Sequence, residues 1–594
     1  MKRTATGIAL LASTLCAALA MHAQTTPAKD PWWKHAAIYE IYPRSFGDTN
    51  GDGLGDLNGI TAHMGYLNQL GVDTIWIAPM YPSPQVDFGY DISDYVAVAP
   101  EYGTMADFDE MMASARQHHI RVVLDFVLNH TSDKHKWFLE SASSRTNPKA
   151  DWYVWNDGVP ADGPNVGAYQ KRWVQQSNHG PVVPPNNWKS GFGGSAWEWV
   201  PARQQFYYHK FYKQQPDLNW RNPAVEKAMY DVIRFWLDRG VAGFRLDAVP
   251  TLFEDTQLRN EPERGGINAQ GDPNLRDIYT NNLPEVHDVM RKMRAIVDSY
   301  PGDRVLIGET YLPNAQAMLA WYGGDKLNEL QLPMDMRLGF NSKNANHLDA
   351  THFRTVLTEE QTVLRNAQSL LVFDNHDNPR SWNRFGDGKH DPQIARILST
   401  VLYTTPATAM TYYGAELGMT TQTPTRKGDV RDPIGITGWP KEKGRDGERT
   451  PMQWTPGPQA GFSTNPNTWL PVEPTYKSIN VQSELADPHS LLTWNRTLLK
   501  LRSSDPVMRH GSMLLLDVTN ESVLSYMRVL GKRAIVVSLN MSAVPQTVHL
   551  DLSAARIMPR KATPLLVEGS SLGAKQDATE ITLQPFGTMV AEIP

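Results

Sequence analysis

The segment Arg121-Val-Val-Leu-Asp125-Phe-Val-Leu-Asn129-His130 is an apolar run that ends in polar side chains. Short apolar runs rich in β-branched residues are typical of buried strands. Seven more runs of this kind occupy residues 38–46, 74–80, 242–249, 305–310, 331–336, 370–377 and 409–413. Most are followed by helix-like segments, such as residues 105–117 and 225–239. Eight strands alternating with helices predict an α/β fold, a parallel (β/α)₈ TIM barrel.

Two connections are too long for simple barrel loops. Residues 131–215 are rich in Trp, Asn, Gly and Pro, which predicts an inserted subdomain after the third strand. Residues 251–282 form a second excursion, expected near the mouth of the barrel. Short alternating segments at 523–529, 534–539, 547–552 and 579–583 predict a C-terminal antiparallel β domain. We therefore expect a barrel (30–130 and 216–505), an insertion (131–215) and a C-terminal domain (506–594).

The start of the chain resembles a secretory signal. Lys2 and Arg3 precede an apolar stretch that ends in small residues, so residues 1–23 are expected to be a signal peptide. This implies export to the periplasm or the medium. The only cysteine, Cys16, lies within this segment, so the mature chain has no disulfide. A net charge of −6 gives no reason to expect nucleic acid as a partner. We expect no membrane span after removal of the signal; the oligomeric state is left open.

Polar side chains gather at the ends of four predicted strands. They are Asp125, Asn129 and His130 on the third, Arg245 and Asp247 on the fourth, Glu309 on the fifth, and His376 and Asp377 on the seventh. Barrel enzymes build their active sites at the carboxyl ends of the strands. One acidic residue after a strand is often only a cap, but four such strands indicate a catalytic site.

These same segments resemble the four signatures of glycoside hydrolase family 13, the α-amylase family. They are Asp125-Phe-Val-Leu-Asn-His130, Gly243-Phe-Arg-Leu-Asp247, Gly308-Glu309 and Phe373-Asp-Asn-His-Asp377. Within that family, Gln215-Pro-Asp-Leu-Asn-Trp220 and the segment from Gly444 to Trp454 resemble the oligo-1,6-glucosidase and α-glucosidase branch. The resemblance extends from about Trp32 to the end of the chain.

The resemblance implies a retaining mechanism with two carboxyl groups. Asp247 matches the family's nucleophile, Glu309 its acid/base, and Asp377 the third carboxylate that grips the sugar. Arg245, on the same strand face as Asp247, is expected to keep that nucleophile ionised. The substrate-binding residues that the resemblance implies are Asp87, Tyr90, His130, Phe192, Arg245, His376 and Arg445. Among these, Asp87 and Tyr90 would close the non-reducing end of the pocket.

A further loop spaces oxygen ligands at alternate positions. Its side chains Asp48, Asn50, Asp52 and Asp56, with the carbonyl of Leu54, suit a hard cation. The loop begins like an EF-hand, but Gly59 stands where the bidentate glutamate would be. The family carries a similar Ca²⁺ loop, so the resemblance implies a structural Ca²⁺, with Mg²⁺ as an alternative. No cofactor is expected in the chemistry.

We therefore expect an exo-acting retaining α-glucosidase that acts on short α-glucosides such as maltose. Ala248 follows the nucleophile, where valine goes with α-1,6 cleavage in this branch, so α-1,4 links are expected to be preferred. Transglucosylation, trehalose synthesis, and sucrose-directed or α-1,6-directed cleavage on the same scaffold remain alternatives. A non-catalytic transporter partner is disfavoured because every catalytic carboxylate is present and no span follows the signal.

Overall fold

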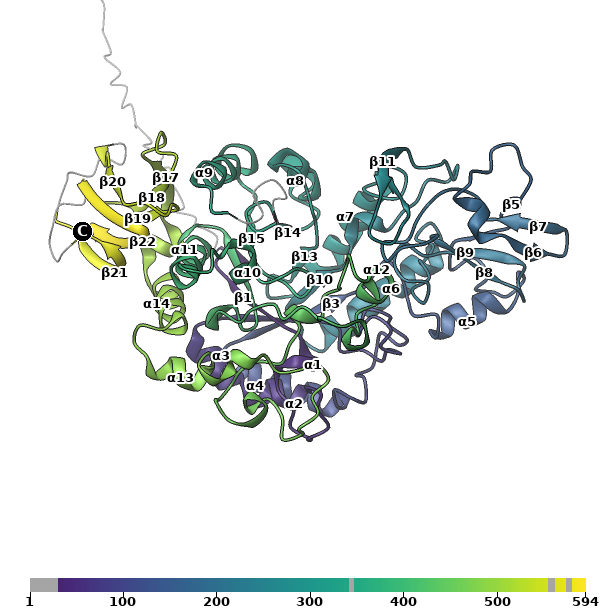
Figure 1. Cartoon of the computed structure of the whole chain (residues 1–594), viewed down its shortest axis with the longest axis horizontal. Helices are drawn as coiled ribbons and strands as arrows, with labels where there is room; N and C mark the ends of the chain where they lie inside the picture. The colour runs from purple at the N-terminus through teal and green to yellow at the C-terminus, as the bar shows by residue number, and fades with distance from the viewer. Residues whose placement is uncertain (1–29, 341–346, 554–560, 573–579, 594) are drawn as a thin grey trace, which may run out of the picture.

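The computed structural model of the protein describes residues 30–340, 347–553, 561–572 and 580–593. The signal peptide expected at residues 1–23 lies outside this part of the chain. Among the described helices, none is long and apolar enough to cross a membrane. The barrel lies in the middle of the molecule, with the C-terminal strands at one end and the strands of residues 155–208 at the other (Figure 1).

Eight parallel strands close into a barrel, which confirms the predicted (β/α)₈ fold. Each barrel strand pairs with the barrel strands that precede and follow it in the chain, and β1 pairs with β16 to close the ring. The strands are β1 (Ala37–Ile41), β2 (Thr74–Ile77), β3 (Arg121–Phe126), β10 (Gly243–Leu246), β13 (Val305–Gly308), β14 (Leu332–Asp335), β15 (Leu370–Val372) and β16 (Thr408–Tyr412).

Several strands are shorter than the apolar runs that predicted them. The run 38–46 is a strand only to Ile41, and Pro43–Phe46 forms the short helix α1. Proline suits the first turn of a helix because the N–H that it lacks would have no partner there. In a strand the same missing N–H would cost a hydrogen bond to the neighbouring strand. The run 242–249 ends as a strand at Leu246, and Ala248 adopts a left-handed conformation with φ 44°. The ends of these runs are therefore loops at the mouth of the barrel.

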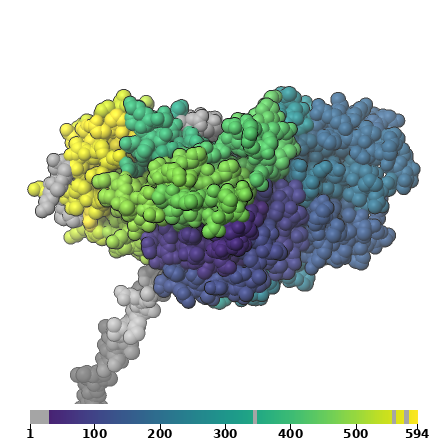
Figure 2. Space-filling view, turned by 60° about the horizontal axis from the view of Figure 1, so that its bottom comes forward, coloured from purple at the N-terminus to yellow at the C-terminus, as the bar shows by residue number. Residues whose placement is uncertain are grey.

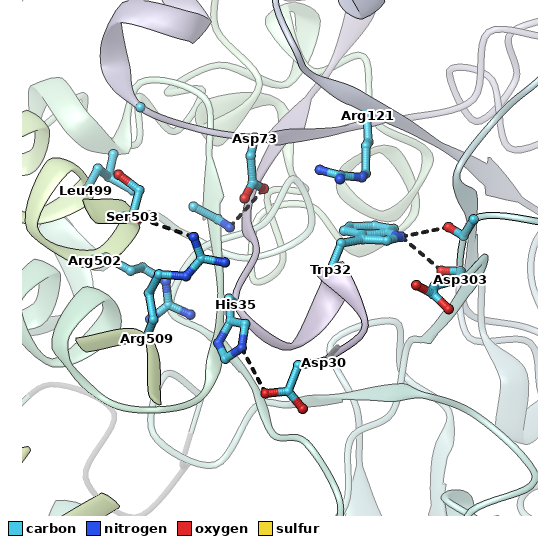
Figure 3. A pocket seen from close by; sticks show the side chains of 13 residues that line it. Asp30, Trp32, His35, Asp73, Arg121, Asp303, Leu499, Arg502, Ser503 and Arg509 are labelled. Atoms are coloured by element: carbon cyan, nitrogen blue, oxygen red, sulfur yellow. Dashed lines mark hydrogen bonds and ion pairs between the residues drawn. The ribbon is translucent and has the colours of Figure 1, made fainter. Parts of the chain in front are cut away.

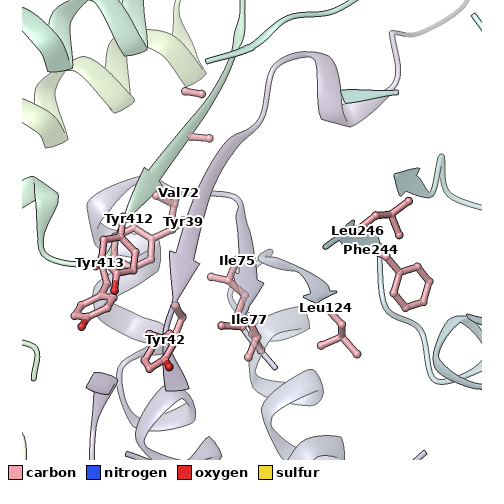
Figure 4. Close-up of a cluster of buried hydrophobic side chains, with 14 of the residues drawn as sticks. Tyr39, Tyr42, Val72, Ile75, Ile77, Leu124, Phe244, Leu246, Tyr412 and Tyr413 are labelled. Atoms are coloured by element: carbon pink, nitrogen blue, oxygen red, sulfur yellow. The ribbon is translucent and has the colours of Figure 1, made fainter. Parts of the chain in front are cut away.

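The two faces of the strands have different partners. Inward side chains, including Ile38, Trp76 and Val123, fill the barrel. Outward side chains such as Tyr39, Ile75, Ile77, Leu124 and Phe244 belong to the large apolar cluster that includes the surrounding helices (Figure 4). Because these strands are buried on both faces, their sequences are almost continuously apolar and do not alternate.

Helices cover the outside of the barrel. Two that the sequence predicted are α4 (Met105–Gln117), with a capping box between Thr104 and Asp107, and α6 (Pro223–Asp238), capped by Asn222. The others include α2 (Leu57–Ala62), α3 (Met64–Leu70), α7 (Glu285–Asp298), α8 (Ala315–Trp321), α9 (Ala350–Glu359), α11 (Asp391–Thr404) and α14 (Leu491–Ser504). Side-chain caps satisfy N–H groups that a helix start leaves unpaired.

The segment between β3 and β10 contains helix α5 (Lys136–Ser143) and two small antiparallel sheets. One sheet has β4 (Trp155–Asn156), β9 (Gln205–Tyr208) and β8 (Trp197–Val200); the other has β5 (Val159–Pro160), β7 (Gly180–Val183) and β6 (Gln175–Ser177). His130 pairs with Asp217 in an isolated bridge, which brings the two ends of the segment together. The 251–282 excursion carries the hairpin β11 (Glu263–Ile267) and β12 (Pro273–Leu275).

The C-terminal strands form the predicted antiparallel sheet. The path is β17 (Ser512–Leu516), β18 (Val523–Leu530), β19 (Arg533–Asn540), β22 (Glu580–Ile593) and β20 (Gln546–His549), and β21 (Thr563–Ser570) also pairs with β22. Arg528, buried in β18, donates to the carbonyls of Thr404 and Gly511, and so ties the sheet to helix α11.

Segments far apart in the sequence meet beside the barrel mouth. The green surface formed after residue 400 lies against the purple surface of the first hundred residues (Figure 2). Backbone hydrogen bonds join Asp48 N–H to Phe462 O, and Met452 N–H to Ser45 O. The indole of Trp454 also donates to Phe46 O. The late loops therefore help to hold the first βα loop in place.

Candidate active site

A cavity of about 180 Å³ lies at the carboxyl ends of the barrel strands. Ten residues were predicted from the sequence to be catalytic or substrate-binding; eight of them line it, and Arg245 and His376 lie directly behind. The complete lining is Asp87, Tyr90, His130, Gly191, Phe192, Phe211, Gln215, Asp247, Ala248, Glu309, Asp377, Ile434 and Arg445. The fold thus brings together side chains spread over more than 350 residues of sequence.

Arg245 is the centre of this site. Its Nη1 lies 2.7 Å from Oδ1 of Asp247 and 3.1 Å from Oδ2 of Asp125, and its Nη2 lies 2.9 Å from Oε2 of Glu309. The guanidinium is buried, so these ion pairs are little screened by water. One cation is therefore shared by three carboxyl groups from three neighbouring strands.

Asp247 and Glu309 titrate as a pair. Burial raises the pKa of each to about 7, although the charge of Arg245 lowers both. Asp377 raises both pKa values, and Asp247 itself raises that of Glu309. The Ala248 N–H donates to Oε2 of Glu309 at 3.0 Å. Because two carboxyls share one cation, one can be ionised while the other keeps its proton.

Asp377 has a different environment. Its Oδ1 accepts from Arg445 at 2.9 Å and from Arg449 at 2.8 Å, and His376 Nε2 lies 3.3 Å from its Oδ2. Burial alone would raise the pKa of Asp377, but His376 and the two arginines hold it well below the usual range. This carboxylate is thus ionised throughout the neutral range and offers fixed acceptor oxygens to the cavity.

One side of the cavity is closed by a second ion-pair network. Arg445 Nη2 lies 2.7 Å from Oδ1 of Asp87 and 2.6 Å from Oδ1 of Asp432. Its guanidinium also lies 5.5 Å from the centre of the Phe192 ring. Because this network uses both charge and packing, it forms a rigid wall next to Asp377.

The histidines are held by direct hydrogen bonds. His130 Nε2 lies 3.1 Å from the Tyr90 carbonyl and 3.2 Å from Nε2 of Gln215. His376 Nε2 lies 2.7 Å from Oη of Tyr90, whose ring stacks on the imidazole. Burial lowers the pKa of His130 to about 3, so it is neutral and can exchange hydrogen bonds with hydroxyl groups.

The structure adds residues that sequence reasoning missed. Gln215 and Arg449 lie within motifs already quoted, so closer attention to those motifs would have found them. Asp432 sits in an irregular loop, and Phe211 and Ile434 are ordinary apolar residues; no sequence signal marks them. They reach the cavity only through tertiary folding.

A larger cavity, of about 550 Å³, lies at the opposite end of the barrel (Figure 3). Asp73 precedes β2 there and accepts from the Ala37 N–H, while the Trp32 indole donates to the Asp303 carbonyl at 2.9 Å. None of the predicted site residues lines it. We place the chemistry in the smaller cavity because that cavity holds the coupled carboxyl groups.

The predicted cation loop forms successive turns beside α2. Oδ1 of Asp48 accepts from the Gly51 N–H at 2.7 Å, Oδ1 of Asn50 from Asp52, and Oδ1 of Asp52 from Leu54. Asp56 caps α2 through Gly59 and accepts from Thr49 as well. Each of the first three side-chain oxygens thus accepts from a backbone N–H of the loop itself. Asp56 can reach a cation only with lone pairs that its hydrogen bonds leave free.

Comparison with known proteins agrees with this geometry. Residues 40–511 match the family described as alpha amylase, catalytic domain. The chain is 40% identical to maltase 1 of Drosophila virilis, over 95% of this chain and 87% of that protein. It is 35% identical to the oligo-1,6-glucosidase of Parageobacillus thermoglucosidasius, over 95% and 99%. The solved structure of trehalulose synthase MutB from Pseudomonas mesoacidophila MX-45 superposes with a TM-score of 0.83, at 33% identity over 95% and 100%.

The family match covers most of the chain, and the four sequence signatures meet at one cavity. The chain belongs to the α-amylase family, glycoside hydrolase family 13.

Proposed function

We propose that this protein is an exo-acting, retaining α-glucosidase that releases α-glucose from the non-reducing end of short α-glucosides. The observation that carries this proposal is the meeting of Asp247 and Glu309 on one buried guanidinium at the wall of a small cavity. Relatives named maltase and oligo-1,6-glucosidase support this substrate class. Glycosidases that retain configuration need two such carboxyl groups, one ionised and one protonated.

In the proposed reaction, Asp247 attacks the anomeric carbon as Glu309 gives its proton to the departing oxygen. The bond to the second sugar breaks, and a covalent glucosyl-aspartate forms. Glu309, now ionised, then takes a proton from water, which attacks the same carbon and restores Asp247. Arg245 favours the ionised state of Asp247 at the start and offsets charge on Glu309 in the middle.

We assign recognition of the terminal glucose to Asp377, Arg445 and His130, with His376 behind the cavity in contact with Asp377. Asp377 supplies acceptor oxygens, whereas Arg445 supplies donors from the wall it forms with Asp87. That wall borders the cavity on the side of the terminal glucose, which supports exo action. Tyr90 lines the cavity and stacks on His376 with one face of its ring, so only the other face or the edge can meet the sugar.

We propose that Ala248 sets a preference for α-1,4 over α-1,6 links. Ala248 lines the cavity between the nucleophile and the acid, where the leaving sugar must dock. A methyl side chain leaves more room there than a branched one. Differences of one or two methyl groups in a pocket are worth about 1–3 kcal/mol, so the preference is graded rather than absolute.

The likeness to trehalulose synthase supports a second candidate, in which another sugar rather than water accepts the glucosyl group. The two activities share the first step and differ only in the acceptor. Product analysis on sucrose separates them, because hydrolysis yields glucose and fructose, whereas isomerisation yields a disaccharide with a new linkage.

We also propose a structural Ca²⁺ in the Asp48–Asp56 loop, held by Asp48, Asn50 and Asp52 with the Leu54 carbonyl, and with Asp56 as an outer member. Support comes from the spacing of oxygen-bearing side chains at alternate positions of the successive turns, because such oxygens are ligands that suit Ca²⁺. Export of the protein, by the signal expected at residues 1–23, is likewise a proposal from the sequence. Comparing the N-terminal residue of the secreted protein with the encoded one tests export.

Replacing the nucleophile should abolish turnover without unfolding the protein. Asp247→Asn is expected to lower kcat on maltose on the order of 10⁴-fold, because no covalent intermediate can form. Asp231→Asn, on the outer face of α6, is the matched control and should leave kcat unchanged. Proton NMR of the wild-type reaction should show α-glucose first; β-glucose as the first product would contradict a retaining mechanism.

The pH dependence should identify Glu309 as the acid. Its pKa of about 7 means that the proton is present below neutral pH and lost above it, so kcat/KM on maltose should fall as pH rises through 7. Glu309→Gln should lose about 10³-fold on maltose but far less on α-glucosyl fluoride, whose leaving group needs no proton. The wild type should show the alkaline limb on maltose but not on the fluoride; an equal limb on both substrates would assign it to a group other than the acid.

Linkage preference should respond to the shape of residue 248. Ala248→Val is expected to narrow or reverse the maltose to isomaltose ratio of kcat/KM, which should be tenfold to a few hundredfold in the wild type. Ala248→Thr is the matched comparison: it has the same branching as valine and the same strain at φ 44°, but carries a hydroxyl in place of one methyl group. If both variants leave the ratio unchanged, selectivity is set elsewhere, such as in residues 251–282.

Removing the proposed Ca²⁺ should lower the melting temperature. An ion that binds only the folded state stabilises it by about 2.7 kcal/mol when free Ca²⁺ is 100 times its Kd. EDTA should therefore lower Tm in the wild type and in the exposed control Asp162→Ala, but not in Asp52→Ala. Equal Tm values with EDTA and with millimolar Ca²⁺ would rule out a stabilising ion.

A further inference from the structure

Glu40 is a buried acid that the reaction described above does not use. It lies on β1 with its side chain inside the barrel and none of its surface exposed. Its Oε1 is 2.5 Å from Nδ1 of His376, and its Oε2 has no hydrogen-bond partner among the described residues. A buried carboxylate with an unpaired oxygen is costly, whereas a protonated carboxyl is much less so.

The proton positions around His376 follow from its neighbours. Asp125 accepts two hydrogen bonds from Arg245, and Tyr90 Oη lies 3.1 Å from Asp125 Oδ2. A phenol has one proton, and this contact takes it. The 2.7 Å contact between Tyr90 Oη and His376 Nε2 therefore requires the histidine to donate. Nε2 of His376 carries a proton.

One proton must also lie between Glu40 and Nδ1 of His376, since the contact is 2.5 Å. It resides either on the carboxyl, with a neutral imidazole, or on the imidazole, with an ionised carboxylate. Burial raises the pKa of Glu40 and lowers that of His376, each well away from its usual value. Tyr42 and Trp76 pack around the imidazole ring, and the arginines nearby disfavour a second cation.

We propose that Glu40 is a positioning residue whose protonated carboxyl donates to Nδ1 of His376 and so fixes the tautomer in which Nε2 donates. The Nε2–H then lies between Tyr90 and Asp377, at 2.7 and 3.3 Å, and holds both at the rim of the cavity. Glu40 acts only through His376 and touches no substrate. The kinetic part of this inference rests on the proposed α-glucosidase function.

Two substitutions of Glu40 distinguish its role as a hydrogen-bond donor from a role in packing alone. Glu40→Gln places an amide N–H where the carboxyl O–H was, so it should keep kcat/KM on maltose within about threefold of the wild type. Glu40→Met fills similar volume but cannot donate, so His376 can adopt the other tautomer. Loss of that hydrogen bond should lower kcat/KM about 10- to 100-fold.

Glu416→Met is the matched control for removing a buried glutamate. Glu416 is also buried; its Oε1 accepts from Tyr39 and Tyr66, and its Oε2 is unpartnered among the described residues, but it does not line the catalytic cavity. This variant should lose thermal stability as Glu40→Met does, yet keep kcat/KM below its melting temperature. A purely structural role for Glu40 predicts equal activity losses in the two methionine variants.

The protonation state of His376 can also be measured without turnover, by ¹⁵N NMR of histidine-labelled enzyme. The His376→Gln variant identifies which signal belongs to His376. Nδ1 should be unprotonated in the wild type and in Glu40→Gln. Protonated Nδ1, or a Glu40→Gln variant as impaired as Glu40→Met, would overturn the proposal, since both indicate an ionised Glu40. Full activity in Glu40→Met would overturn it too. If the wild type cleaves no α-glucoside, the function fails and the NMR result alone decides the role of Glu40.

Discussion

The buried guanidinium of Arg245 is the interaction on which the rest of the site depends. Asp125, Asp247 and Glu309 converge on it from three adjacent strands. Without a cation, three carboxyls at this depth would all be driven to their neutral forms by desolvation. With one cation for three acids, the site keeps some ionised and leaves at least one protonated. That uneven balance lets a single pocket offer both a nucleophile and an acid.

The barrel explains why these groups meet. Inside it, apolar side chains such as Ile38, Val123 and Ile307 give way, two residues further along the same strands, to Glu40, Asp125 and Glu309. Alternation along a strand keeps each pair on the inner face. The lower layers therefore supply the packing that stabilises the fold, and the upper layer of the same strands carries the charge. A shift of one residue in any strand would turn its acid outward.

Much of this arrangement could be predicted from the sequence, and the failures have a common cause. The eight apolar runs showed the barrel, and the polar residues at their ends showed the site. When a strand is buried on both faces, its sequence does not alternate and so does not show which side chains point inward. The sequence therefore contains no sign that Glu40, within 38–46, points into the barrel. Asp432 and Ile434 were missed because they lie at the start of a short, late helix, α12 (Pro433–Gly438), whose approach to the cavity depends on tertiary folding. The strands were also shorter than their runs.

The two sides of the cavity differ in how readily they can change. On the glucose side, Asp87, Asp377 and Asp432 share Arg445, so altering one member leaves buried charges unpaired at a cost of several kcal/mol. On the side of the leaving sugar, Ala248 contributes an apolar contact, and differences of one or two methyl groups in a pocket are worth only about 1–3 kcal/mol. Substitutions there change affinity for one acceptor or linkage without disturbing the ionised wall. The same scaffold can therefore keep its glucosyl donor while its relatives differ in what they cleave or form.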